Sequence, residues 1–342
     1  MSVTAFGEID GKKVQEIRLK AASGAEASVI SLGATLRDLL VPMKGGGNRR
    51  VVLGFEALDG YLAGHSYMGS TCGRVGNRIA GGAFALDGKS YSLPRNEAGR
   101  THLHGGKRGF SHRPWDVVDH QSDQVTMRLV SPDGEEGYPG KVEASCTYRL
   151  KDPGTIEIVL GATTDAPTLV NLVNHSYFTL LEDAEIWDHR LEIAGPFYTR
   201  LDPELIPTGE IVSVAGTPFD FRKARPIRLM QDGKPFDYDV NFVLGTLAPL
   251  GSAGDVAARA TASDGKMAME VATTEPGLQL YTGAVLGPAG AGVGGQKHFP
   301  HAGFCLEAQR FPDAVHHRHF AQATLRPGER YHQVTEYRFK AL

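Results

Sequence analysis

The chain has 342 residues, of which 41% are hydrophobic and 22% charged, a balance typical of a globular protein with a large core. A formal net charge of −3 and the lack of a Lys/Arg-rich block argue against nucleic-acid binding. No apolar run approaches the ~20 residues of a membrane span, and residues 1–11 lack the features of a secretory signal. The widely spaced Cys72, Cys146 and Cys305 indicate no disulfide framework. We therefore expect a cytoplasmic protein.

Short alternating apolar runs, separated by glycines and prolines, follow one another along the chain. Residues 27–41 predict one or two strands with Gly33 at a bulge or bend, and residues 83–93 predict a hairpin around an Asp-Gly turn. Only residues 55–63 resemble a helix, and a short one. Further strands are expected at residues 124–130, 141–150, 155–163, 266–274 and 278–284. The pattern predicts an all-β fold, with one large β-sandwich domain over residues 1–342.

Residues 168–180 read as one buried strand, yet this apolar run contains two asparagines and His175. Burying such groups costs a few kcal/mol each unless partners satisfy them. An isolated histidine of this kind is more often a satisfied core residue. However, residues 303–311 form a second apolar run with one carboxylate, Glu307. Because a buried imidazole and a buried carboxylate suffice for paired acid–base catalysis, we expect the fold to bring these two side chains together.

Two phosphate-loop patterns nearly occur, and both fail. Residues 82–90 end in Gly-Lys-Ser but have one residue too many for a P-loop and lie in the predicted hairpin. Residues 290–294 are glycine-rich but have no βαβ context. The His-dense residues 316–319 are interpreted as a solvated face rather than a metal site, because adjacent side chains of an extended chain point to different sides.

His102 and His104 are two residues apart, which on an extended chain places both rings on one face. A metal site would need more ligands than this stretch shows, although Glu97 is within chain reach. We favour a cleft in which one histidine faces a ligand, while Gly105 and Gly106 let that ligand approach the backbone. No metal site is therefore predicted.

Three further segments are rich in hydrogen-bonding groups. Arg74, Asn77 and Arg78 lie among glycines and offer the planar donor sets that sugar hydroxyls or carboxylates need, although this stretch taken alone is better explained as an ordinary surface turn with exposed arginines. Residues 237–242 form an acidic turn that opens a strand. Gln279 lies on the polar face of a half-polar strand, which lines a pocket or faces solvent.

Six stretches together carry a family resemblance. They are GRVGNRIAGGAF (73–84), LHGG with RGF (103–110), EEGYPG (135–140), NHSYF (174–178), PGLQLYTG (276–283) and LEAQRFPDA (306–314). In this order, and spread over most of the chain, they resemble the aldose 1-epimerase (galactose mutarotase) family. One such motif is weak, but six in order make a chance match very unlikely.

The resemblance implies a large single-domain β-sandwich of the galactose-mutarotase type. It also implies a cofactor-free enzyme that interconverts the α and β anomers of a free monosaccharide such as galactose or glucose. By position, Glu307 resembles the catalytic base of the family, His175 its catalytic acid, and His104 its second active-site histidine.

The resemblance further assigns the sugar-hydroxyl contacts to Asn77, Arg78, Asp239 and Gln279. One departure concerns the segment Asp239-Val240-Asn241, where family members often have Asp-His-Asn. The carboxylate is retained, but the change bears on which sugar is preferred. His102 and Arg74 have weaker claims and are expected only to support the pocket.

The residue types suit anomerisation, which removes a proton from the C1 hydroxyl and delivers one to the ring oxygen. We expect Glu307 to be desolvated, which would raise its pKa, and His175 to be protonated at rest, with acceptors nearby to hold its charge. The expected arrangement places the two groups on opposite sides of the pyranose.

Two alternatives remain open from the sequence. A sugar-phosphate epimerase on the same fold would need an arginine cluster at the pocket rim, for which Arg74, Arg78, Arg108 and Arg113 are the candidates. A non-catalytic sugar-binding sensor would keep the cleft but would have no use for the histidine–glutamate pair. The presence of both residues favours catalysis.

Overall fold

Buried and more exposed residues alternate along the strands, as in β13 (Val142–Lys151). In the computed structural model, which describes residues 3–63, 66–244 and 253–342, every second side chain of this strand is buried, from Val142 to Leu150. Successive side chains of a strand point to opposite faces of its sheet. One face of β13 therefore packs into the core while the other lies nearer to solvent.

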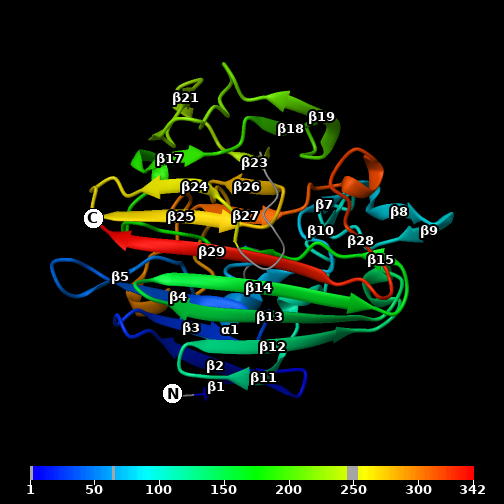
Figure 1. The fold of residues 1–342 in the computed structure, drawn as a ribbon, viewed down its shortest axis with the longest axis horizontal. Coiled ribbons are helices and arrows are strands. Elements are labelled where there is room, and N and C mark those ends of the chain that lie inside the picture. Colours follow the sequence, from blue (N-terminus) through cyan, green and yellow to red (C-terminus); the bar gives the residue numbers. More distant parts are fainter. Residues whose placement is uncertain (1–2, 64–65, 245–252) are drawn as a thin grey trace.

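The largest sheet has nine strands, each antiparallel to its neighbours, and its long strands run horizontally through the lower and middle parts of Figure 1. In order across the sheet, its strands are β11 (Asp116–His120), β12 (Gln124–Ser131), β13, β14 (Thr155–Thr164), β29 (Tyr331–Ala341), β25 (Met267–Thr273), β24 (Val256–Thr261), β17 (Arg190–Ile193) and β20 (Arg225–Pro226). The sheet forms one layer of the fold.

Two five-stranded antiparallel sheets lie against the large sheet. The first consists of β1 (Val3–Ile9), β2 (Lys12–Lys20), β3 (Glu26–Ile30), β4 (Thr35–Pro42) and β5 (Asn48–Arg50). The second has the order β19 (Pro207–Ser213), β18 (Phe197–Leu201), β23 (Asp239–Val243), β26 (Gly277–Tyr281) and β27 (Cys305–Gln309). Both sheets contribute to the same core.

One hydrophobic cluster joins the layers and takes residues from all three sheets, among them Leu36, Tyr148 and Leu306. Hydrogen bonds also cross between the layers. The hydroxyl of Tyr337 in β29 donates to the carbonyl of Leu306 in β27 at 2.8 Å, and the hydroxyl of Tyr148 donates to the carbonyl of Ala34 at 2.7 Å. Because the sheets stack face to face through an apolar core, the predicted all-β sandwich is confirmed.

Short elements complete the described residues. The two-stranded ladders pair β6 (Thr71–Cys72) with β16 (Val173–Asn174), β7 (Arg78–Ile79) with β10 (His102–Leu103), β8 (Ala83–Leu86) with β9 (Lys89–Ser92), β15 (Thr168–Leu169) with β28 (Thr324–Leu325), and β21 (Met230–Gln231) with β22 (Lys234–Pro235). The α-helix is α1 (Leu58–Ala63), and single 3-10 turns lie at Ala80–Gly82, Phe110–His112, Glu135–Gly137, Ile186–Asp188, Val293–Gly295 and Ala314–His316. No helix in the described ranges has the length and apolar character needed to cross a membrane.

Most of the predicted elements are present. Gly33 turns the chain between β3 and β4 with φ +64°, and a Cβ there would lie 2.6 Å from the carbonyl oxygen of Ser111. The predicted hairpin is β8–β9, with positive φ at both Asp87 and Gly88, as a type I′ turn requires. The short helix is α1, and the five further strands are β12, β13, β14, β25 and β26, although β26 ends at Tyr281 rather than near residue 284.

The prediction of one strand over residues 168–180 is wrong. The whole segment is buried, but it forms ladders only at β15 and β16, and its Asn171 and Phe178 make isolated β-bridges. The side chain of Asn171 binds backbone groups as a neighbouring strand would. It accepts a hydrogen bond from the backbone N–H of Arg310 at 2.9 Å and donates one to the carbonyl of Arg310 at 3.2 Å. The side-chain nitrogen of Asn174 donates to the Gly69 carbonyl at 3.1 Å. The asparagines are therefore structural residues, satisfied by these partners.

Candidate active site

The second five-stranded sheet has one apolar and one polar face where β23, β26 and β27 lie side by side. Even-numbered residues of these strands, such as Leu280 and Leu306, enter the hydrophobic core, so the odd-numbered residues point the other way. The cross-strand register then forms two rows: Asp239, Tyr281 and Cys305, and beside them Asn241, Gln279 and Glu307. Because side chains alternate between the two faces of a strand, the ionisable and amide groups of these three strands lie on one surface of the sheet.

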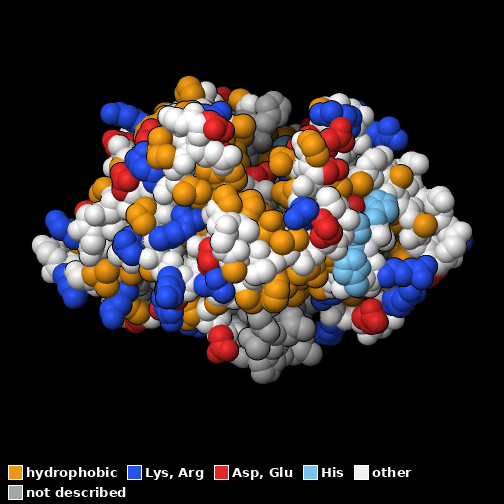
Figure 2. Space-filling model, turned by 90° about the horizontal axis from the view of Figure 1, so that it is seen from above, with side chains coloured by type: hydrophobic (Ala, Val, Ile, Leu, Met, Phe, Trp, Pro, Cys, Tyr) orange, Lys and Arg blue, Asp and Glu red, His pale blue; other side chains and the backbone are white. Residues whose placement is uncertain are grey.

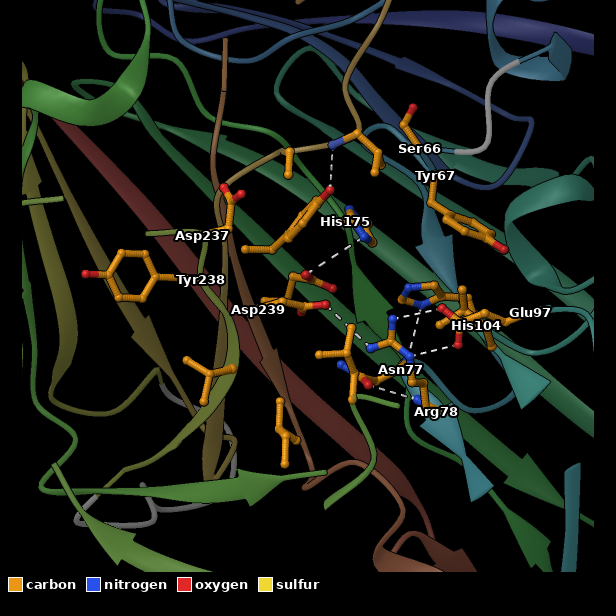
Figure 3. Close-up of a pocket in the computed structure, with 18 of the residues that line it drawn as sticks. Ser66, Tyr67, Asn77, Arg78, Glu97, His104, His175, Asp237, Tyr238 and Asp239 are labelled. Atoms are coloured by element: carbon orange, nitrogen blue, oxygen red, sulfur yellow. Dashed lines mark hydrogen bonds and ion pairs between the residues drawn. The ribbon is translucent and has the colours of Figure 1, made fainter. Parts of the chain in front are cut away.

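A cavity of about 780 Å³ opens over this surface (Figure 3). Hydrogen-bonding side chains of its lining include Asn77, Arg78, Glu97, His104, His175, Asp239 and Glu307. Its aromatic and aliphatic lining includes Tyr67, Tyr177, Tyr198, Leu201, Leu205, Phe219, Phe236 and Tyr238. Apolar walls with a few convergent polar groups are typical of a small-molecule site.

His175 and Glu307 meet in this cavity. His175 follows directly after β16, and Glu307 is the central residue of β27. The Nε2 atom of His175 lies 3.8 Å from Oε1 of Glu307, and the two side chains are only 7% and 3% exposed. The expectation that the fold unites this imidazole and this carboxylate is confirmed.

Burial decides the protonation of this pair. Desolvation raises the pKa of Glu307 well above 4.5, with the charge of Asp239 acting in the same direction and that of Arg78 against it. Desolvation also lowers the pKa of His175 to about 4. The prediction that His175 is protonated at rest is therefore wrong, because burial penalises its charged form. Burial therefore acts against charge on both groups, the carboxylate of Glu307 and the imidazolium of His175.

The distance between the two groups corrects a second expectation. A pyranose ring cannot lie between atoms that are 3.8 Å apart, so the acid and the base do not flank a sugar from opposite sides. They face the same region of the cavity. This arrangement still suits anomerisation, since the C1 hydroxyl oxygen and the ring oxygen are both bonded to C1.

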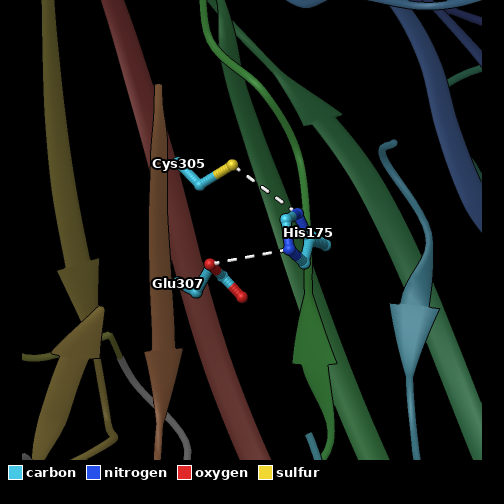
Figure 4. Close-up of side chains that lie close together, drawn as sticks. All are labelled: His175, Cys305 and Glu307. Carbon is cyan, nitrogen blue, oxygen red and sulfur yellow. Dashed lines mark hydrogen bonds and ion pairs between the residues drawn. The ribbon is translucent and has the colours of Figure 1, made fainter. Parts of the chain in front are cut away.

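The imidazole of His175 is held on several sides. Its ring stacks on Tyr177, with centroids 5.1 Å apart and planes at 30°, and Tyr67 lies at 6.0 Å with the same tilt. The sulfur of Cys305 lies 3.6 Å from Nδ1, the nitrogen remote from Glu307 (Figure 4). These contacts fix the plane of the ring and leave Nε2 toward Glu307.

His175, Cys305 and Glu307 offer donor atoms within 4.8 Å of one another and are the group, among the residues described, that could hold a metal ion. Their arrangement does not suit one ion, however. Cys305 faces Nδ1 and Glu307 faces Nε2, whereas an imidazole binds an ion through one nitrogen. An ion bound at either nitrogen would be displaced from the donor that faces the other nitrogen.

His104 also lines the cavity, with its ring centroid 5.1 Å from that of His175. Its Nδ1 accepts the backbone N–H of Asn77 at 3.2 Å, which leaves the ring hydrogen on Nε2. Burial lowers its pKa well below 6.5, so it is a neutral donor. The motif needs its glycine, because Gly105 has φ +82° and a Cβ there would lie 1.6 Å from the carbonyl oxygen of Gly73.

The prediction that His102 and His104 share one face is wrong. His104 has φ +48°, which breaks the alternation of the strand and turns its ring into the cavity. His102 is fully buried elsewhere, with Nδ1 2.8 Å from the Pro94 carbonyl and Nε2 2.7 Å from the hydroxyl of Tyr138. His102 is thus a satisfied core histidine, in keeping with a supporting role.

Arg78 joins two carboxylates at the cavity wall (Figure 3). Its Nε and Nη2 donate to Glu97 at 2.8 and 2.9 Å, and its Nη1 lies 3.5 Å from Oδ2 of Asp239. The neighbouring Asn77 accepts the backbone N–H of Arg78 through its side-chain oxygen at 2.9 Å. Charges of both signs therefore line one wall, and each is held by a fixed partner.

Gln279 lies behind Asp239 and does not line the cavity. Its side-chain nitrogen donates to Oδ1 of Asp239 at 2.6 Å, and its oxygen accepts from Gln309 at 3.1 Å. Gln309 in turn donates to the side-chain oxygen of Asn241 at 3.1 Å. These hydrogen-bonded amides hold Asp239 from the side away from the cavity. A direct contact of Gln279 with a ligand stays a prediction.

Two other predicted groups lie away from the cavity. The guanidinium of Arg74 is buried and donates to Ser131 and to the carbonyls of Ser131, Pro132 and Pro139, as a supporting residue would. The histidines at 316, 317 and 319 bond to three different acceptors, the side chain of Asp313 and two backbone carbonyls. On the face seen from above, basic and acidic side chains are interspersed (Figure 2).

Sequence reasoning missed several cavity residues. Glu97 was considered only as a metal ligand, and no local signal connects it to Arg78, which lies 19 residues earlier. The aromatic walls come from separate segments, including Tyr198 in β18 and the loop residues Phe219 and Phe236. Cys305 does not line the cavity but contacts His175, and its place two residues before Glu307 on the same face of β27 could have revealed this.

Comparisons with known proteins agree with this geometry. The family model described as aldose 1-epimerase matches residues 15–338. The chain is 41% identical to a galactose mutarotase of Rattus norvegicus and 36% identical to an aldose 1-epimerase of Escherichia coli, in each case with at least 97% of both chains covered. It superposes on a solved aldose epimerase homologue from C. elegans with a TM-score of 0.88 at 30% identity, covering 96% of this chain and 99% of the other. The chain therefore belongs to the aldose 1-epimerase family.

Proposed function

We propose that this protein is an aldose 1-epimerase, a mutarotase that interconverts the α and β anomers of a free monosaccharide such as galactose or glucose. The observation that carries the proposal is the buried pair of His175 and Glu307, 3.8 Å apart and open to a cavity of about 780 Å³. The relatives named galactose mutarotase and aldose 1-epimerase support the same activity. A cytoplasmic location is part of the proposal, in keeping with three free, buried cysteines.

The reaction needs one base and one acid. Glu307 takes the proton of the C1 hydroxyl while Nε2 of His175 gives a proton to the ring oxygen. The electron pair of the O1–H bond becomes the second bond of the aldehyde carbonyl, and the C1–O5 bond breaks. Rotation about C1–C2 then presents the other face of the aldehyde, and the reverse transfers close the ring as the second anomer. Each group finishes the cycle in its starting state.

The active form of the pair is an ion pair, with the carboxylate of Glu307 and the imidazolium of His175. It contains the same number of protons as the resting form, in which both groups are neutral, so a proton moves within the pair without exchange with solvent. The sugar favours the ion pair, because its C1 hydroxyl donates to the carboxylate and its ring oxygen accepts from Nε2–H. Pre-organised groups in a desolvated cavity stabilise such charges more strongly than water does.

The cavity wall supplies the sugar contacts in this proposal. Arg78, Asn77 and the Nε2–H of His104 are donors, and Asp239 is an acceptor that Gln279 holds in place. The aromatic walls would cover the C–H faces of the ring. Asp239 contacts both the guanidinium of Arg78 and the side-chain amide of Gln279, so its carboxylate is held from two sides.

The placement of the arginines counts against a sugar phosphate as substrate. Arg74 is buried away from the cavity, Arg108 pairs with Asp10, and Arg113 pairs with Glu135. Of the four candidates for a phosphate cluster, only Arg78 lines the cavity, and its charge is taken up by two carboxylates. The histidine–glutamate pair, in turn, has no use in a protein that only binds sugar.

Polarimetry tests the proposal. Freshly dissolved α-D-galactose and α-D-glucose are followed with the purified protein, with its His175→Ala variant, and without protein. We expect the native protein to accelerate equilibration and the variant to lose that effect. Equilibration at the uncatalysed rate with both sugars, in a folded native protein that still binds them, would replace the mutarotase proposal by a sugar-binding role.

A further inference from the structure

Cys305 contacts the imidazole of His175 at Nδ1, whereas Glu307 faces Nε2. Both residues belong to β27 and are two positions apart, so the strand presents them on the same face. The sulfur of Cys305 lies 3.6 Å from Nδ1, and Oε1 of Glu307 lies 3.8 Å from Nε2 (Figure 4). Two residues of one strand thus lie next to the two ring nitrogens of His175.

The position of Cys305 is fixed by its surroundings. It is fully buried, and it pairs across the sheet with Tyr281, whose neighbour in the next strand is Asp239. Burial raises the pKa of its thiol well above 9.0, so the sulfur carries no charge near neutral pH. A thiol is a weak donor and a weak acceptor of hydrogen bonds.

We propose that Cys305 is a positioning residue that keeps a hydrogen on Nδ1 of His175, so that Nε2 alone exchanges protons during catalysis. The inference rests on the proposed mutarotase function. In it, Nδ1–H donates to the sulfur throughout the cycle, while Nε2 alternates between a lone pair and N–H. The opposite tautomer, with its hydrogen on Nε2, could not accept the proton that the resting pair holds on Glu307.

Sulfur suits this position better than a carboxylate would. A carboxylate beside Nδ1 would stabilise the imidazolium and raise the pKa of His175. A neutral thiol keeps the hydrogen on Nδ1 without stabilising the positive charge of the imidazolium. The imidazolium then gives up its Nε2 proton readily. The low pKa of His175, about 4, agrees with this environment.

The first test is the tautomer itself. Nitrogen NMR on ¹⁵N-histidine-labelled native protein, with the His175 signals assigned by their loss in His175→Ala, should show Nδ1 bonded to hydrogen and Nε2 bare at pH 7. In Cys305→Ala, the signals should move toward the Nε2–H tautomer. A native protein with its hydrogen on Nε2 would overturn the proposal, whether or not the protein turns over sugar.

Turnover gives the second test. Cys305→Ala should lower kcat by up to about tenfold, because a weak hydrogen bond that selects the tautomer is lost, with little change in KM. Cys305→Ser restores an acceptor and should regain most of the loss. Cys146→Ala removes an equally buried thiol from β13 and should change neither kcat nor the His175 tautomer. An unchanged kcat in Cys305→Ala, or no rescue by serine, would contradict the role.

The two proposals fail differently. If the native protein does not accelerate mutarotation, the function is wrong, while the tautomer measurement still reports on the contact between Cys305 and His175. If the native protein is active and Cys305→Ala matches it in kcat and in tautomer, only the positioning role is wrong.

Discussion

Replacing Arg78 by methionine should damage both stability and activity. The guanidinium makes two short hydrogen bonds to Glu97 and lies 3.5 Å from Asp239. Charge-assisted hydrogen bonds contribute about 1.5–3 kcal/mol each, which would give roughly 3–6 kcal/mol for the pair with Glu97 in a fully buried site. Because Glu97 is 30% and Asp239 26% exposed, water takes over part of the lost contacts. We therefore expect Arg78→Met to lower the free energy of unfolding by about 2–4 kcal/mol.

The loss should depend on pH. Burial alone would raise the pKa of Glu97, but the hydrogen bonds from Arg78 and Thr101 and the charges of Arg78 and Arg100 together outweigh it and hold this pKa below 4.5. A carboxylate whose folded-state pKa is lowered stabilises the protein fully above its ordinary pKa, and this contribution disappears as the pH falls through the lowered value. The difference between native protein and Arg78→Met should thus be full at pH 7 and should shrink in acid.

Urea unfolding at pH 7 and below pH 4, followed by circular dichroism, measures this loss. The matched control is Arg200→Met, since Arg200 also lines the cavity but forms an exposed ion pair with Glu210, with side chains 52% and 58% exposed. Exposed pairs contribute about 0–1 kcal/mol. If both variants lost the same small amount at pH 7, the view of Arg78 as the structural centre of this wall would be refuted.

Three further results are expected. In an NMR titration of the ligand-free protein, His175 should protonate near pH 4 because burial penalises its charge, whereas a midpoint at or above 6.5 would contradict this. Asp239→Asn removes a charge that raises the pKa of Glu307, so the basic limb of kcat/KM against pH should shift to lower pH, and an unmoved limb would exclude that coupling. Gln279→Met removes the anchor of Asp239 and should raise KM for galactose about tenfold, while equal KM values would show that the anchor is not needed.

The fold was predictable where local patterns decide it. The Asp-Gly turn specifies the β8–β9 hairpin, and Gly33 sits where a positive φ is needed. The segment 168–180 was not predictable in the same way. Its composition favours a strand, but Asn171 bonds to the backbone of Arg310, 139 residues away. That partner is set by tertiary structure, which no local window contains.

The sequence predicted which residues form much of the candidate site, but it did not predict how they are arranged. The polar residues in apolar runs pointed to His175 and Glu307, and the structure places them together. The charge of His175 was mispredicted, because desolvation depends on how deeply the ring is buried. His102 was misplaced because the positive φ of His104 breaks the strand alternation. Gln279 shares a cross-strand row with Glu307 but does not line the cavity, a difference that strand alternation alone does not give.

The turnover of Glu307→Gln tests the central claim most directly. The matched control is Glu275→Gln, since Glu275 is another carboxylate with a side chain 3% exposed and a pKa raised by burial, to about 7, but it does not line the cavity. Polarimetry with α-D-galactose should show a loss of about 100- to 10,000-fold for Glu307→Gln and turnover close to the native value for Glu275→Gln, with both proteins folded. Turnover close to the native value in a folded Glu307→Gln protein would remove Glu307 from the role of base and contradict the proposed mechanism.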